Sequence, residues 1–150
     1  IAIADRGNGI ARTLRDKFPG LSESERIEHA LKPGISRFDP TTAFGDWANT
    51  GFGLYLLSEI GKFYGEFSIV SNGNYFRYTN DDRTLQEQSL FFTGTALKLA
   101  IYTRDIEYFP NFLKLKIQEG EKWYKNTYDQ DIKASSKSKG SGSSNRWNAR

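Results

Sequence analysis

The chain of 150 residues is 37% hydrophobic and 26% charged, which is typical of one globular domain of about 17.1 kDa. It contains no cysteine, which excludes disulfides, cysteine-bound zinc and thiol catalysis, and its single histidine, His29, excludes any site that needs two imidazoles. No apolar run approaches the ~18 residues of a membrane span.

The first half of the sequence predicts a strand and three helices around glycine-rich turns. Residues 1–4 are apolar and lead into glycines, as a strand before a tight turn does. The chain also starts inside this apolar run and has no methionine, so we expect its natural N-terminus to lie further upstream. Ser22-Glu23-Ser24-Glu25 matches the pattern that begins a helix, and Pro33-Gly34 is expected to end it. The other expected helices are 10–17 and 53–64, and residues 34–50 are expected to form a loop.

The second half predicts a sheet followed by an aromatic segment. Asn72-Gly73-Asn74 separates two strand-like runs, 66–71 and 75–79, and Asn-Gly is a strong hairpin signal. Residues 80–88 are polar and are interpreted as a turn or an exposed connection. Residues 89–93 and 95–102 flank Gly94 as one bent strand or two short ones. The aromatic extension 105–132 has no clear period, and we interpret it as a helix that packs on the sheet or as a surface for a partner.

The positive charge is concentrated at the C-terminus. Residues 133–150 carry five Lys or Arg and no acid, so the rest of the chain has a net charge of −2 within the total of +3. This Ser/Gly/Lys-rich tail is too polar to bury much surface and is expected to be disordered. We therefore consider nucleic-acid binding unlikely, because the basic character belongs to a solvated end.

Three glycine-bearing turns are the candidate functional residues. They are Asp5-Arg6-Gly7-Asn8-Gly9, Asn49-Thr50-Gly51-Phe52-Gly53-Leu54 and Thr93-Gly94-Thr95. Each alone is more often a plain chain reversal, but together they have complementary chemistry. A buried Asp at the end of a strand, as Asp5 is expected to be, can accept a hydrogen bond from the exocyclic amine of adenine, and glycines beside it let a flat base approach. The start of a helix favours phosphate, and a threonine hydroxyl can reach the base or a bridging water. The combination predicts a nucleotide site.

These motifs, in this order, resemble the GHKL ATPases over about residues 1–101, and residues 51–71 are most similar to the histidine-kinase-like branch. The resemblance implies an α/β fold of the Bergerat type, a two-layer sandwich with a mixed, mostly antiparallel sheet and helices on one face. It assigns 1–104 to the C-terminal part of the ATP-binding domain, with an ATP lid at about 10–50, followed by 105–132 and the tail 133–150. It also implies a cytoplasmic protein of the bacterial regulatory type.

The resemblance assigns roles residue by residue. Asp5 would accept the adenine amine, Gly7 and Gly9 would form the first glycine box, and Thr95 would share a water with Asp5. The residues that would form the second box, around the phosphates, are Thr50, Gly51, Phe52, Gly53 and Leu54. The family's Mg²⁺-binding asparagine and general-base glutamate lie on a helix upstream of Ile1, so no catalytic residue or metal ligand can be named in this chain.

Several positions depart from the family or fit rival sites poorly. Arg6 stands where relatives often carry Asn, Phe38-Asp39-Pro40 is only a faint version of a sensor-kinase motif, and His29 is expected to be a solvated or partly packed residue. A Rossmann turn fails because Arg12 stands at the third glycine position, no Gly-Lys-Ser/Thr forms a P-loop, and no later Glu completes a calcium loop.

Three functional interpretations remain open. The parent protein hydrolyses ATP or transfers its phosphate, with Mg²⁺ and a closing lid. Alternatively, ATP controls an interaction with a protein partner or a second copy, without catalysis. In the third interpretation the glycine boxes are relics and the aromatic segment is a binding platform.

Overall fold

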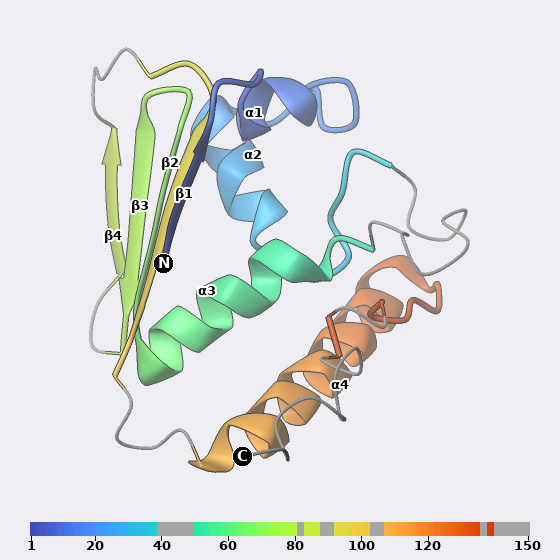
Figure 1. The fold of residues 1–150 in the computed structure, drawn as a ribbon. Coiled ribbons are helices and arrows are strands. Elements are labelled where there is room, and N and C mark those ends of the chain that lie inside the picture. The colour runs from blue at the N-terminus through green and yellow to red at the C-terminus, as the bar shows by residue number, and fades with distance from the viewer. Residues whose placement is uncertain (39–49, 81–82, 88–91, 103–106, 136–137, 140–150) are drawn as a thin grey trace.

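A computed structural model describes residues 1–38, 50–80, 83–87 (backbone alone), 92–102, 107–135 and 138–139. The chain is an α/β protein in which one sheet is covered by helices, as the sequence predicted (Figure 1). The elements in chain order are β1 (Ala2–Asp5), α1 (Ile10–Thr13), α2 (Glu23–Ala30), α3 (Phe52–Tyr64), β2 (Gly65–Ser71), β3 (Asn74–Thr79), β4 (Arg83–Glu87), β5 (Thr95–Ile101) and α4 (Phe109–Tyr128).

The described strands form one five-stranded sheet in the order β1-β5-β2-β3-β4. Every pairing among them is antiparallel, which agrees with the mostly antiparallel sheet that was expected. The predicted hairpin between β2 and β3 is confirmed. Ser71 pairs with Asn74, and the two turn residues Asn72 and Gly73 have φ values of 50° and 80°, which is the left-handed geometry that suits a tight hairpin. The register also places Asp5 of β1 directly opposite Thr95 of β5.

The interpretation of residues 80–88 as a turn or exposed connection was wrong for Arg83–Glu87. These residues form the edge strand β4, in which Arg83 pairs with Tyr78 and Glu87 with Asn74. Polar residues are common on edge strands, which need only backbone pairing on one side. The polar composition of the segment therefore did not indicate a strand, which forms through its backbone pairing with β3. The strand expected over residues 89–93 lies partly outside the described residues, which exclude 88–91. The next strand, β5, begins at Thr95.

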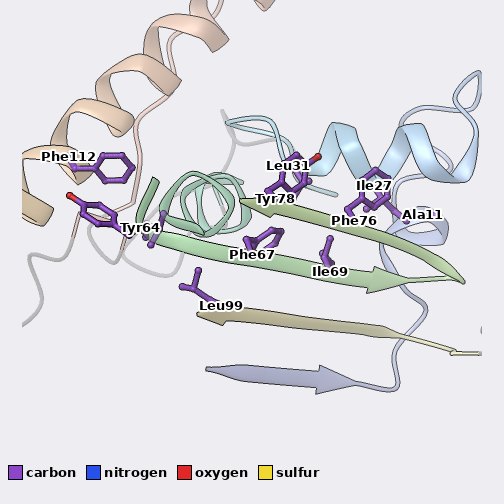
Figure 2. Close-up of a cluster of buried hydrophobic side chains, with 11 residues drawn as sticks. Ala11, Ile27, Leu31, Tyr64, Phe67, Ile69, Phe76, Tyr78, Leu99 and Phe112 are labelled. Carbon is purple, nitrogen blue, oxygen red and sulfur yellow. The ribbon is translucent and has the colours of Figure 1, made fainter. Parts of the chain in front are cut away.

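The helices lie on one side of the sheet (Figure 1). On β2 and β3 alternate side chains are buried. Phe67 and Ile69 of β2 and Phe76 of β3 are fully buried, and Ile27 of α2 packs against the same cluster (Figure 2). A fully buried side chain of this size contributes about 1.5–3 kcal/mol. Gly61 of α3 lets the helix lie close to β2, because a Cβ there would be 2.3 Å from the Cβ of Phe67.

Two of the predicted helix boundaries follow from local signals. The Oγ of Ser22 accepts from the Glu25 amide at 3.3 Å, and the Glu25 carboxylate accepts from the Ser22 amide at 2.7 Å. This capping box confirms the predicted start of α2. The helix expected over 53–64 is α3, which begins one residue earlier and is followed directly by β2 at Gly65.

The aromatic extension contains α4, which packs along α3 (Figure 1), and Phe112 near its start joins the cluster that covers the sheet. A second buried cluster joins the two helices, and the Tyr55 hydroxyl donates to the Lys116 carbonyl at 3.1 Å. Ala134 is buried in this cluster, so the packed part of the chain continues past the expected boundary at 132. Residues 136–137 and 140–150 of the expected tail lie outside the described residues. None of the helices among the described residues is long and apolar enough to cross a membrane.

Candidate functional site

A cleft of about 510 Å³ opens between the ends of β1 and β5, α1, the loop after α2 and the start of α3. Small-molecule sites usually have volumes of about 300–1,000 Å³. The cleft gathers residues from all three glycine turns that the sequence singled out. Those that line it are Asp5, Gly7, Asn8, Gly9, Gly51, Gly53, Leu54 and Thr95.

Asp5 lies at the point where β1 ends and the first glycine turn begins. Its Oδ1 accepts a hydrogen bond of 2.7 Å from the Gly7 amide, which fixes the carboxylate in the turn. No other hydrogen bond to this carboxylate is present among the described residues. The side chain was expected to be buried, but β1 is an edge strand and Asp5 is exposed at the rim of the cleft. Its Oδ2 can therefore accept a donor from a ligand.

Gly9 lines the cleft and is also closely packed in the first turn. It has a φ of 75°, and a Cβ there would be 2.1 Å from the Oδ1 of Asn72. Asn72 in turn donates to the Asn8 carbonyl at 3.2 Å. The hairpin turn between β2 and β3 is thereby locked against the first glycine turn.

Ser71 connects the first and third turns, and the sequence analysis did not assign it a role. Its side chain is fully buried, and its Oγ accepts from the Ile10 amide at 2.8 Å. The same oxygen lies 3.3 Å from both the Thr95 hydroxyl and the Gly94 carbonyl. A serine at the end of a strand before an Asn-Gly turn is the only signal in the sequence, and it does not reveal these partners.

The two glycines of the second turn have different environments. Gly51 has a φ of 72°, and a Cβ there would be 2.6 Å from the Ile35 carbonyl oxygen. Gly51 is therefore required by its contact with the loop after α2. Gly53 has no atom within 4 Å of the position of a Cβ, so its backbone is open to the cleft.

Thr50 and Phe52 do not line the cleft, although both were predicted as site residues. Thr50 is 8% exposed, and Phe52 is fully buried in the cluster that joins α3 to α4. At the first positions of a helix, successive side chains point in directions about 100° apart, so Gly53 and Leu54 face the cleft while Phe52 faces α4.

The charges in the cleft are separated. Among the described lining residues, Asp5 is the anion, beside the sheet, and Arg37 is the cation, on the loop after α2. Lys17 holds that loop by donating to the Ser36 carbonyl at 2.9 Å and the Phe38 carbonyl at 3.4 Å. The described residues supply no side-chain cap to the start of α3, whose first amides are close to this wall. The region around Arg37 and Gly53 is thus suited to an anion.

The remaining candidates have different positions. Arg6 is exposed and does not line the cleft, Phe38 does line it, and Asp39-Pro40 lie outside the described residues. His29 is partly buried on α2, with its Nε2 3.4 Å from the Tyr128 hydroxyl. Burial lowers the pKa of His29, and the nearby Lys32 adds to this effect. In the part of the chain that the structure describes, no group of three His, Asp or Glu could hold a metal ion.

Comparison of the chain with known protein families, with curated proteins and with solved structures finds no match.

Proposed function

We propose that this cleft binds ATP, as part of an ATP-binding domain of the GHKL type. The observation that carries the proposal is the convergence of Asp5, Gly53 and Thr95, which are far apart in the sequence, on one cleft of about 510 Å³. The resemblance of the three glycine turns to that family, made from sequence alone, supports the same assignment.

The end of the cleft beside the sheet suits the adenine base. The Asp5 carboxylate is an acceptor only, and its Oδ2 is available to the exocyclic amine. Thr95 faces it from the neighbouring strand and offers a hydroxyl to the base or to a bridging water. Guanine carries a carbonyl where adenine has its amine, so this arrangement favours ATP over GTP.

The opposite wall suits the phosphates. The backbone of Gly53 is open to the cleft at the start of the 13-residue α3, where the helix dipole favours negative charge. The guanidinium of Arg37 can form charge-assisted hydrogen bonds with phosphate oxygens. Asp5, the one carboxylate among the described lining residues, lies on β1 and not on this wall.

The Mg²⁺ that neutralises the phosphates would be held, by the resemblance, by residues upstream of Ile1. For the complete parent protein we propose lid-gated hydrolysis or phosphotransfer, in the cytoplasm. The alternative is an ATP-controlled interaction with a protein partner or a second copy of the chain. Phosphate release in a single turnover separates the two, because only the first produces it.

The test of binding is calorimetric titration with ATP and GTP, with and without Mg²⁺. Replacement of Asp5 by Asn removes the carboxylate and presents an amide donor instead. A hydrogen bond to a charged group contributes about 1.5–3 kcal/mol, so Asp5→Asn should bind ATP about tenfold to a hundredfold more weakly. Asp16→Asn, at an exposed aspartate outside the cleft, is the matched control. Equal ATP affinity in the Asp5→Asn and Asp16→Asn variants would contradict the assignment of the base site.

A further inference from the structure

The backbone of α4 makes an unusually close contact with the start of α3. A Cβ at Gly120 would be 2.9 Å from ring carbons of both Phe52 and Tyr55 and 3.0 Å from Pro33. Side chains rarely approach this closely, so α4 reaches this position because residue 120 has no side chain. Phe52, which this contact holds, directly precedes the open Gly53 of the cleft.

The same helix covers the back of the loop after α2. Gly34 has a φ of 79°, and a Cβ there would be 2.2 Å from the ring of Tyr124 and 3.1 Å from Ile132. The next residues, Ile35 to Arg37, line the cleft on the other side. Gly51 lies against the Ile35 carbonyl and joins this loop to the start of α3. The single segment of backbone formed by residues 34–37 therefore separates α4 from the cleft, and we refer to it as the wall.

The C-terminal part of α4 packs apart from the main core. Ile117 and Tyr124 belong to a cluster with Phe52 and Tyr55 of α3, whereas Phe112, near the start of α4, belongs to the cluster that covers the sheet. Polar contacts support this packing, with Lys116 pairing with Glu59 at 3.1 Å and the Tyr128 hydroxyl lying 3.4 Å from the His29 ring. A change in how the C-terminal part of α4 packs can thus move the wall, while Phe112 keeps the start of the helix on the main core.

We propose that α4 is a positioning element for the phosphate side of the cleft, and that the packing of α4 and the binding of nucleotide are coupled. The proposal rests on the proposed ATP site. Gly120 and Tyr124 act through Phe52 and Gly34, and touch no ligand themselves. Because coupling between two sites is reciprocal, displacement of α4 weakens nucleotide binding, and bound nucleotide tightens the packing of α4. A partner that binds α4 would thereby control the site.

The first test compares two valine variants of the full chain. Gly120→Val places a branched side chain in the contact with α3. Lys122→Val introduces the same residue at an exposed position of the same helix, so both share its helix propensity. We expect Gly120→Val to bind ATP at least fivefold more weakly than Lys122→Val in calorimetric titration. Gly120→Ala, with an intermediate effect, keeps the comparison informative if the valine variant fails to fold.

The second test uses hydrogen exchange. In the unchanged chain, saturating ATP should slow amide exchange in the C-terminal half of α4, which no ligand contacts. Without nucleotide, the amides of residues 34–38 should exchange faster in Gly120→Val than in Lys122→Val. Because a ligand of the folded state stabilises the whole protein, the slowing in α4 must exceed that of the amides of β3 to indicate coupling; equal slowing in α4 and β3 would contradict it.

The outcomes separate the two proposals. Failure of the unchanged chain to bind ATP would overturn the proposed function, and exchange at residues 34–38 would then decide whether α4 positions the wall. ATP binding with equal affinity in both valine variants and unchanged exchange in α4 would overturn the coupling alone.

Discussion

The two glycines of the second turn should respond in opposite ways to the same substitution. Gly53→Ala adds a methyl group where the structure has open space and where φ is in the ordinary range. A compatible Gly-to-Ala change stabilises a protein by about 0.4–1 kcal/mol, because it restricts the unfolded chain. For a chain of this size, Tm should rise by about 1–4 °C.

Gly51→Ala should destabilise the protein. Its φ of 72° costs a residue with a side chain about 1–2 kcal/mol. The new Cβ would also lie 2.6 Å from the Ile35 carbonyl oxygen, which is backbone and cannot turn aside. A fall in Tm of about 4 °C or more is expected, and scanning calorimetry of both variants measures the contrast.

Gly53→Ala should weaken the binding of ATP although it stabilises the fold. The methyl group occupies the cleft where the proposed phosphate contact is made, and loss of one charge-assisted hydrogen bond weakens binding about tenfold to a hundredfold. The variant would then be more stable than the unchanged chain and bind ATP less well. Undiminished ATP affinity in a stabilised Gly53→Ala protein would refute the placement of the phosphates at the start of α3.

Three further predictions concern stability. Ser71→Ala leaves the Ile10 amide without its acceptor and should lower the free energy of unfolding, measured with urea, by about 1–3 kcal/mol. A loss below about 0.5 kcal/mol would contradict the connection that Ser71 makes between the first and third turns. Hydrogen bonds, of which that from Lys98 is the largest cause, lower the pKa of Glu66 to about 2. Its contribution to the free energy of unfolding is therefore present above pH 4.5 and is lost as the pH falls toward 2. Glu66→Gln should flatten the dependence of stability on pH in that range, and an unchanged slope would contradict this. Burial lowers the pKa of His29 below 6.5, so the unfolded chain binds the proton more readily than the folded one. The free energy of unfolding should therefore fall as the pH drops from 7 toward 5. His29→Gln should reduce this fall, and an equal fall in the variant would exclude His29 as its cause.

The secondary structure was predictable where a local signal decides it. The Ser22 capping box begins α2, and the Asn72-Gly73 turn fixes the β2–β3 hairpin, since a few adjacent side chains satisfy or permit the backbone geometry there. β4 was not predictable in this way, because an edge strand is specified by hydrogen bonds to its neighbour and not by its own side chains. The packing of α4 on α3 likewise depends on contacts between residues far apart in the chain, such as Phe52 with Gly120.

By itself, the sequence determined which residues carry chemistry suited to a nucleotide and which glycines punctuate the chain. Only the tertiary structure decided what each of them does. It separated the open Gly53 from Gly51, which packs on Ile35, and it turned Phe52 away from the cleft toward α4. The physical reason is that a glycine has no side chain whose chemistry would indicate its role. Whether the space at its Cβ position is filled by the protein or open to a ligand depends on residues that folding brings beside it.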